Sequence, residues 1–152
     1  MIEFRLATIE DVDALAIMRV RFLCERHDMP PEERELLRLN NAGYFAESLR
    51  DGSFLAWLAV EDGAIVATSG LTVYRLPPNG TNPSGITGYV SNMYTLPERR
   101  RQGLANRLFS MTMEAARARG CGKIVLYATR MGKPIYEKYG FEADEKGMRY
   151  FL

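Results

Sequence analysis

The sequence has few of the residues that metal sites and disulfide bridges require. Its 152 residues include one histidine, His27, and two cysteines, Cys24 and Cys121. One imidazole excludes a site that needs several, and so few thiols argue against structural zinc, so we expect no metal. Without secretory context, we expect free thiols rather than a bridge. Cys121 lies between two glycines, either as a small turn residue or as a nucleophile, but no neighbouring histidine would activate it.

The sequence also lacks an excess of charge and a long apolar run. Twenty Lys and Arg residues against 19 Asp and Glu residues give a formal net charge of +1, which argues against nucleic acid as the main partner. No apolar run is as long as a transmembrane helix, and residues 1–5 lack the basic-then-apolar pattern of a signal peptide. We therefore expect no membrane partner and a cytoplasmic location.

What is present is typical of one globular domain, residues 1–152, because 47% of the residues are hydrophobic and 26% are charged. Residues 2–6 alternate like a strand, and Thr8 is a cap for a helix that reaches about Cys24. A second helical stretch begins at Pro31 and runs to about Arg50. Residues 40–43 weaken its middle, which predicts either two short helices or one bent helix.

Strand patterns fill the middle of the chain. Residues 54–60 form an apolar run of strand length, and Asp62-Gly63 predicts a hairpin turn to a second strand. Gly70 within that second strand indicates a bulge or close packing. Residues 75–88 are rich in Pro, Gly and Asn and predict a loop, either a substrate lid or an idle extension, before a strand near residues 88–96.

The last third predicts a helix, a strand and a short helix. A helix from Gly103 would bury Leu104, Leu108, Met111, Ala115 and Ala118 on one face. Residues 123–128 are of buried-strand type, and a right-handed crossover would make them parallel to the strand before the helix. A helix at 135–139 should stop at Gly140 in the left-handed region, with Phe141 packing back on it. Residues 142–152 would form a final hairpin, with a turn at Lys146-Gly147 and a strand at 148–152.

The turn before Gly103 combines three arginines, residues 99–101, with the start of a helix. Helix N-termini carry free backbone N–H groups and the positive end of the helix dipole, so this turn suits a phosphate or pyrophosphate. The alternative is a solvated basic run without a ligand.

Two segments make the chain resemble the GNAT superfamily of N-acetyltransferases. Arg100, Gly103 and Ala105 fit its acetyl-CoA motif, Gln/Arg-x-x-Gly-x-Gly/Ala, and residues 135–141 match its Leu-Tyr-x-Lys-x-Gly-Phe segment. The order of predicted elements agrees along the whole chain. The resemblance implies an α/β (α+β) fold: a mixed, mostly antiparallel central sheet with a locally parallel, splayed strand pair and helices on both faces.

The resemblance also implies acetyl-CoA as cosubstrate. Backbone N–H groups around residues 101–105 would bind its pyrophosphate, and the fourth strand would bind the pantetheine amides through its backbone. Thr129 stands where relatives often have an asparagine, and Gly132 would serve close approach. The expected binding residues are Met93, Tyr94, Thr95, Arg100, Arg101, Gln102, Gly103, Leu104, Ala105, Thr129 and Gly132.

Tyr136 matches the tyrosine that protonates the leaving CoA thiolate in many relatives. The alternative is a packed core aromatic. Ser91-Asn92 stand where many relatives have a carboxylate, so the usual general base is missing. The amine would then arrive largely neutral, or a base would act through water, with Glu25, His27 and Glu47 as candidates.

These observations predict an acetyl-CoA-dependent N-acetyltransferase in which a primary amine attacks the thioester directly. The acceptor would be a small molecule or a peptide amine, and a homodimer is an open alternative to a monomer. One competing hypothesis is a non-catalytic acyl-CoA-binding or sensing domain. Another is a nucleic-acid-binding module built on residues 99–101, which the small net charge disfavours.

Overall fold

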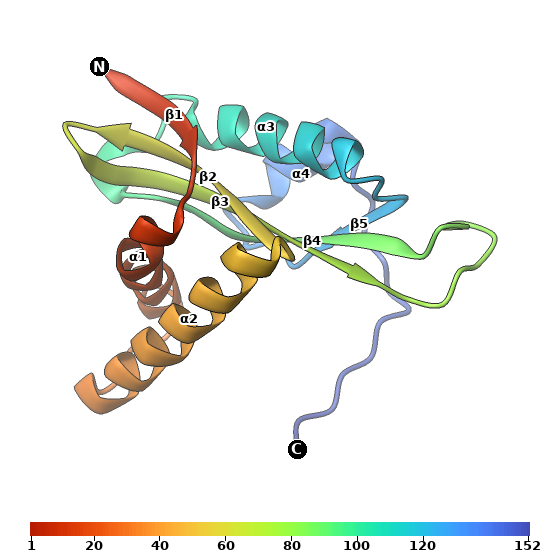
Figure 1. Ribbon diagram of the computed structural model, residues 1–152, viewed down its shortest axis with the longest axis horizontal. Helices are drawn as coiled ribbons and strands as arrows, with labels where there is room; N and C mark the ends of the chain where they lie inside the picture. The colour runs from red at the N-terminus through yellow and green to blue at the C-terminus, as the bar shows by residue number, and fades with distance from the viewer.

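A five-stranded sheet in the order β1-β2-β3-β4-β5 forms the centre of the protein, and the computed structural model describes residues 1–152 (Figure 1). β1, β2, β3 and β4 pair antiparallel, and β4 pairs parallel with β5. The strands are β1 (Ile2–Leu6), β2 (Phe54–Glu61), β3 (Ala64–Arg75), β4 (Ile86–Thr95) and β5 (Lys123–Leu126). The expected mixed, mostly antiparallel sheet with one parallel pair is confirmed.

Helices cover both faces of the sheet, as predicted (Figure 1). The α-helices are α1 (Val12–Cys24), α2 (Pro31–Asp51), α3 (Leu104–Ala118) and α4 (Lys133–Tyr139), and the 3-10 turns are η1 (Ile9–Asp11) and η2 (Pro97–Arg99). α1 and α2 pack on one face around Leu15, Phe45, Phe54 and Leu58. α3 packs on the other face, where its buried residues meet Ala59, Val66, Ala67, Leu71 and Val90.

The two predicted turns with left-handed residues are confirmed. Asp62 and Gly63 both have positive φ, 50° and 79°, which is the backbone of a type I′ hairpin turn. Gly140 ends α4 with φ 108°, and the N–H of Phe141 donates to the carbonyl of Tyr136 at 3.0 Å. The Phe141 ring then lies 5.7 Å from that of Phe109 on α3, so the end of the short helix is fixed against α3.

Of the two alternatives for residues 31–50, the structure has the single helix: α2 is continuous, because a glycine at position 43 costs only about 1 kcal/mol and Phe45 and Ser48 are buried. Two other sequence-based expectations are corrected. The buried face of α3 is Leu104, Leu108, Phe109, Thr112, Met113 and Ala116. Leu104 and Leu108 are thus buried as predicted, whereas Met111 and Ala115 are only partly buried and Ala118 is exposed. The final hairpin is absent: residues 142–152 form no strand and are exposed, because no strand edge pairs with them.

The loop between β3 and β4 extends beyond the sheet (Figure 1) and is held together by its own hydrogen bonds. Asn79 and Asn82 exchange backbone hydrogen bonds at 3.2 Å. The buried Asn82 side chain donates to the carbonyl of Ile86 and to the hydroxyl of Thr87. Its asparagines thus give this loop a defined backbone.

No helix in the structure is both long and apolar enough to cross a membrane.

Gly70 should tolerate no side chain. A Cβ there would lie 2.8 Å from the ring of Phe54, which is 2% exposed and cannot move aside. We expect Gly70→Ala to lower the free energy of unfolding by about 1–3 kcal/mol, measured by urea denaturation. The matched control is Gly43→Ala, where the added Cβ meets open space in a helix and should stabilise by up to about 1 kcal/mol. Equal effects of the two changes would contradict this account of Gly70.

Candidate active site

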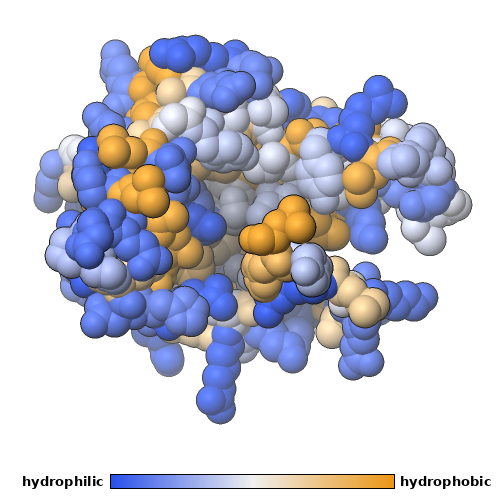
Figure 2. All heavy atoms as spheres, turned by 90° about the horizontal axis from the view of Figure 1, so that it is seen from below, coloured by the Kyte–Doolittle hydropathy of each residue, from blue (hydrophilic) through white to orange (hydrophobic).

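The candidate site is a cleft where β4 and β5 separate. Their parallel pairing ends at Val90 and Leu126, whereas β4 continues to Thr95. The edge of residues 91–95 that faces β5 therefore has no strand partner. A cavity of about 1030 Å³ opens here, between the end of α1, the start of α3 and the start of α4. Figure 2 shows the molecule hollowed near the middle of one face.

A β-bulge in β4 lies beside the point of separation. Thr68 pairs with Tyr94 and Gly70 pairs with Ser91, so β4 has one residue more than β3 between these pairs. Asn92 adopts φ 54°, and its carbonyl accepts a hydrogen bond of 2.6 Å from the Thr68 hydroxyl. A bulge bends the strand and increases its twist. It therefore helps to carry the end of β4 away from β5.

The turn into α3 presents a row of free backbone donors. Arg101 and Gly103 have φ of 64° and 78°, both in the left-handed region. None of the backbone N–H groups from Arg101 to Asn106 donates a hydrogen bond to the backbone of the chain. A Cβ added at Gly103 would meet nothing within 4 Å. Free N–H groups with open space before them at a helix N-terminus fit a pyrophosphate group.

The three arginines of this turn have different partners. Arg99 donates to Glu61 at 2.6 Å, and Arg100 donates to both carboxylate oxygens of Glu25 at 2.7 Å. Arg101 is exposed and forms no ion pair. The alternative of a solvated basic run therefore does not hold for Arg99 and Arg100, and Arg101 is the guanidinium that remains free for an anion.

Glu25, at the end of α1, is held by two donors. Besides Arg100, the Tyr94 hydroxyl donates to its carboxylate at 2.7 Å. Burial alone would raise the pKa of Glu25, but the hydrogen bonds from Arg100 and Tyr94 prevail and lower it. Burial and the bond to Glu25 raise the pKa of Tyr94 to about 12. Glu25 is thus ionised and engaged, which makes it a poor general base.

Tyr136 lies on the opposite wall of the cleft, on α4. Its ring is 7% exposed and packs against Phe109 at 5.1 Å between ring centroids. Its hydroxyl has no hydrogen-bond partner in the chain, although the residue lines the cavity. Burial raises the pKa of Tyr136 to about 12, so the phenol is protonated at neutral pH. The structure therefore combines the two interpretations: the ring is part of the core and the hydroxyl remains a free donor.

Thr129 and Gly132 shape the approach to Tyr136. The Gly132 N–H donates to the Thr129 hydroxyl at 3.0 Å, which fixes the turn before α4. A Cβ at Gly132 would lie 3.3 Å from the Tyr136 ring and 3.5 Å from its hydroxyl. The absence of a side chain at Gly132 thus leaves room for the phenol of Tyr136 at the cavity wall.

Most of the predicted site residues line this one cavity. Tyr136 and all the expected binding residues do so except Gln102, whose side chain is exposed beside the turn. Of the candidate bases, Glu25 and His27 line it and Glu47 does not. Further residues that line the cavity lie in or just after α1 and just after β5, and no specific signal in the sequence marked them: Phe22, Leu23, Arg26 and Tyr127.

Outside the cleft, neither cysteine lies in a second cluster of reactive side chains. Cys24 and Cys121 are free. Burial raises the pKa of the Cys121 thiol, which packs in the core near Gly88, so the nucleophile alternative has no support. No group of three or more His, Cys, Asp or Glu side chains is placed to hold a metal ion.

Comparison with known proteins agrees with this geometry. The sequence model described as "Acetyltransferase (GNAT) family" matches residues 16–141, which is well over half of the chain. The chain belongs to the GNAT family of acetyltransferases. One solved structure, a predicted acetyltransferase with acetyl-CoA from Clostridium acetobutylicum, is 31% identical with a TM-score of 0.92, and the match covers 100% of this chain and 97% of the other.

Two further GNAT relatives are informative. A GCN5-related N-acetyltransferase from Ralstonia eutropha is 26% identical with a TM-score of 0.88 and covers 99% of each chain. A glucosamine 6-phosphate N-acetyltransferase from Trypanosoma brucei brucei is 32% identical over 90 residues, 59% of this chain and 59% of the relative. The match thus spans somewhat more than half of that curated relative.

The Tyr136 phenol should lose its proton at a higher pH than an ordinary tyrosine. Because burial raises its pKa from 10 to about 12, the difference in tyrosinate absorbance between wild type and Tyr136→Phe should develop about two pH units above that of an ordinary tyrosine. Circular dichroism on the same samples tests that the fold persists, and wild type in denaturant gives the unshifted reference. By linkage, the stability that the neutral phenol contributes is present below pH 10 and is lost as pH rises towards 12. A difference signal near pH 10 in folded protein would contradict the burial of this phenol.

Proposed function

We propose that this protein is an acetyl-CoA-dependent N-acetyltransferase that moves the acetyl group to a primary amine by direct attack. The observation that carries the proposal is a protonated, unpartnered phenol, Tyr136, in the same cleft as the free N–H groups that precede and open α3. The similar structure that contains acetyl-CoA supports the choice of acyl donor.

The chain offers two binding surfaces for this donor. The N–H groups from Arg101 to Asn106, together with the free Arg101 guanidinium, suit the pyrophosphate. The unpaired edge of residues 93–95 suits the pantetheine amides, which can add to it as a strand would. Acetyl-CoA supplies an acetyl thioester, the activated form of the group that is transferred. These surfaces would place its thioester end between β4 and α4.

Two groups of the chain then act on the reacting atoms. The backbone N–H of Met93, at the bulge, stabilises the negative charge that develops on the thioester oxygen, because the N–H of the next residue, Tyr94, faces its ladder partner Thr68 on β3. The Tyr136 hydroxyl donates its proton to the departing sulfur, for which its high pKa keeps it in the protonated form. The amine nitrogen attacks directly, so no acyl-enzyme is formed: the new C–N bond replaces the C–S bond. The proton that the nitrogen then sheds balances, through solvent, the one that Tyr136 gives to sulfur.

The attacking amine must lose a proton, and the cleft offers little help with this. Glu25 is the one carboxylate that lines the cleft, and it forms an ion pair with Arg100. Ser91 and Asn92 cannot accept a proton at neutral pH. His27 is the candidate base that remains in the cleft, and its ring has no hydrogen-bond partner in the chain. The amine therefore enters in its neutral form or loses its proton to His27 through water.

A non-catalytic acyl-CoA-binding domain is the second candidate. It would use the turn and the strand edge but would have no need of a free phenol at the thioester end. A nucleic-acid-binding module is disfavoured further, because two of the three arginines of the turn are paired with Glu61 and Glu25.

Replacing the phenol separates catalysis from binding. We expect Tyr136→Phe to lower the rate of acetyl transfer about 10²-fold or more, while the affinity for acetyl-CoA stays close to that of wild type. Release of the CoA thiol with a panel of amines measures the rate of acetyl transfer, and calorimetry measures the affinity for acetyl-CoA. The control is Tyr139→Phe on the same helix, whose hydroxyl accepts from Arg117 outside the cleft and should leave transfer unchanged. Unimpaired transfer by Tyr136→Phe would exclude its role as proton donor, and no transfer by wild type would favour the binding domain.

The pyrophosphate turn should account for most of the affinity. Saturating acetyl-CoA should raise the Tm clearly, whereas S-acetylpantetheine, which lacks the nucleotide and the pyrophosphate, should raise it little. Gly103→Ala should remove this difference, because a side chain strains the left-handed backbone that aims the N–H groups. Gly63→Ala has the same strain in a distant turn with φ 79° and should keep the difference. Equal shifts by both thioesters would show that the turn does not bind the pyrophosphate.

A further inference from the structure

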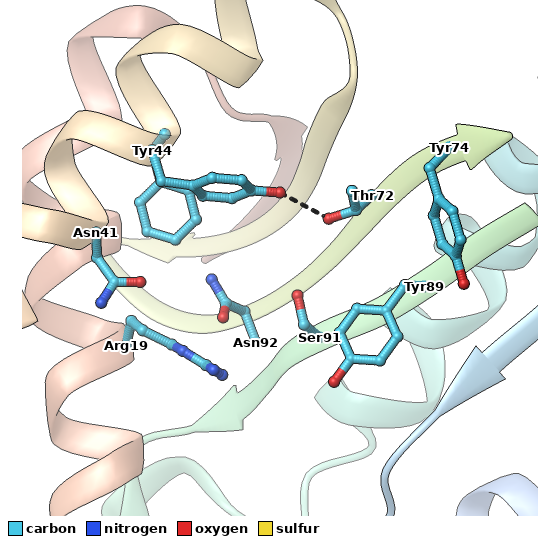
Figure 3. Close-up of a pocket in the computed structure, with 9 residues that line it drawn as sticks. Arg19, Asn41, Tyr44, Thr72, Tyr74, Tyr89, Ser91 and Asn92 are labelled. Carbon is cyan, nitrogen blue, oxygen red and sulfur yellow. Dashed lines mark hydrogen bonds between the residues drawn. The ribbon is translucent and has the colours of Figure 1, made fainter. Parts of the chain in front are cut away.

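A second hollow of about 360 Å³ lies beside the cleft, between the helices α1 and α2 and the strands β3 and β4 (Figure 3). Arg19, Tyr89, Ser91 and Asn92 line both spaces, so the two hollows meet at the bulge of β4. In the proposed function the thioester would lie at this same bulge. A volume of this order suits a small molecule rather than a folded protein surface.

The hollow has one charge, and that charge has no counter-ion. Arg19 is the only charged residue that lines it. No carboxylate lies within 4.0 Å of its guanidinium, which packs 5.6 Å from the Phe22 ring. Burial lowers the pKa of Arg19, and the charged or titratable groups that act on it are Tyr89, Arg26 and Tyr44. A half-buried cation without an anion is costly, and an anionic ligand would offset that cost.

The rest of the lining is neutral and polar. Figure 3 shows the guanidinium of Arg19 and the hydroxyl of Tyr89 directed towards one space, with the Ser91 hydroxyl pointing from β4 towards Thr72. Burial raises the pKa values of Tyr74 and Tyr89, so both phenols are neutral hydrogen-bond donors at neutral pH. The Tyr44 hydroxyl is already paired with Thr72 at 2.8 Å. The hollow thus offers donors to an anion and no carboxylate to a second ammonium group, which disfavours polyamines.

We propose that the acceptor is a small primary amine that also bears a carboxylate or a phosphate, and that Arg19 binds this anionic group while the amine nitrogen lies at the β4 bulge. The inference rests on the proposed acetyltransferase function and adds the substrate class. Arg19 is then a specificity-determining residue. Its planar guanidinium can donate two parallel hydrogen bonds to either kind of anion.

Matched pairs of amines test the proposal. Amino acids are compared with their carboxamides, and 2-amino sugars with and without a phosphate, in acetyl transfer by the wild-type protein. We expect kcat/KM to be about 10- to 100-fold higher for the charged member of at least one pair, the range for a charged hydrogen bond. The pair that shows the preference distinguishes carboxylate from phosphate.

Three variants locate the preference. Arg19→Gln should abolish it by lowering kcat/KM for the charged member alone, and Arg19→Lys should restore part of it. Arg21→Gln makes the same charge change at an exposed position of α1 outside both hollows and should keep it. Equal rates within every pair, or a preference that survives Arg19→Gln, would overturn the proposal.

A binding experiment keeps the two proposals apart. Tyr136→Phe with saturating acetyl-CoA is titrated with the same pairs, so that acceptor binding is read without turnover. Binding of the charged members only, lost on adding Arg19→Gln, supports the anion site even if transfer is slow. Equal or absent binding of the charged members overturns it. Failure of acetyl transfer to every amine by wild type, with acetyl-CoA bound, would instead count against the proposed function and the inference that rests on it.

Discussion

β4 can satisfy only part of its backbone within the sheet, because its parallel pairing with β5 ends at Val90 while the strand continues to Thr95. The unpaired edge must meet a ligand or water. The Asn92 bulge, held by the Thr68 hydroxyl, sets where the strand turns away. The cleft, the neighbouring hollow and the approach of α4 all take their positions from this separation.

Electrostatic contacts join the walls of the cleft to one another. Glu25 at the end of α1 binds Arg100 in the turn before α3 and Tyr94 on β4. The Arg100 Nε also donates to the carbonyl of Thr95 at 3.0 Å. Arg100 therefore joins three walls of the cleft, and in the proposed function the direct contact with the pyrophosphate would fall to backbone N–H groups and Arg101.

Much of this could be predicted from sequence because it depends on local chemistry. Asp62-Gly63, Gly140 and the turn around Gly103 each need a left-handed backbone that few residues adopt. The pairing of Glu25 with Arg100 and the hollow around Arg19 could not be predicted, because each brings together residues that are far apart in the sequence. A period-two signal did exist, since Thr72 with Tyr74 and Tyr89 with Ser91 share one sheet face. The absent final strand depended on a partner edge that no local pattern reveals.

The alternation of side chains along β4 has a consequence for how such an enzyme can diverge. Val90 faces α3 and the core, whereas Tyr89 and Ser91 face α1 and α2. The acyl donor would use this strand through its backbone, which substitution hardly alters. If the proposed acceptor site is correct, replacements in the α1–α2 layer and at these two strand positions would redirect the protein to new acceptors while the acyl-transfer half stays intact. Laboratory evolution towards another amine would begin best at Arg19, Asn41 and Tyr44.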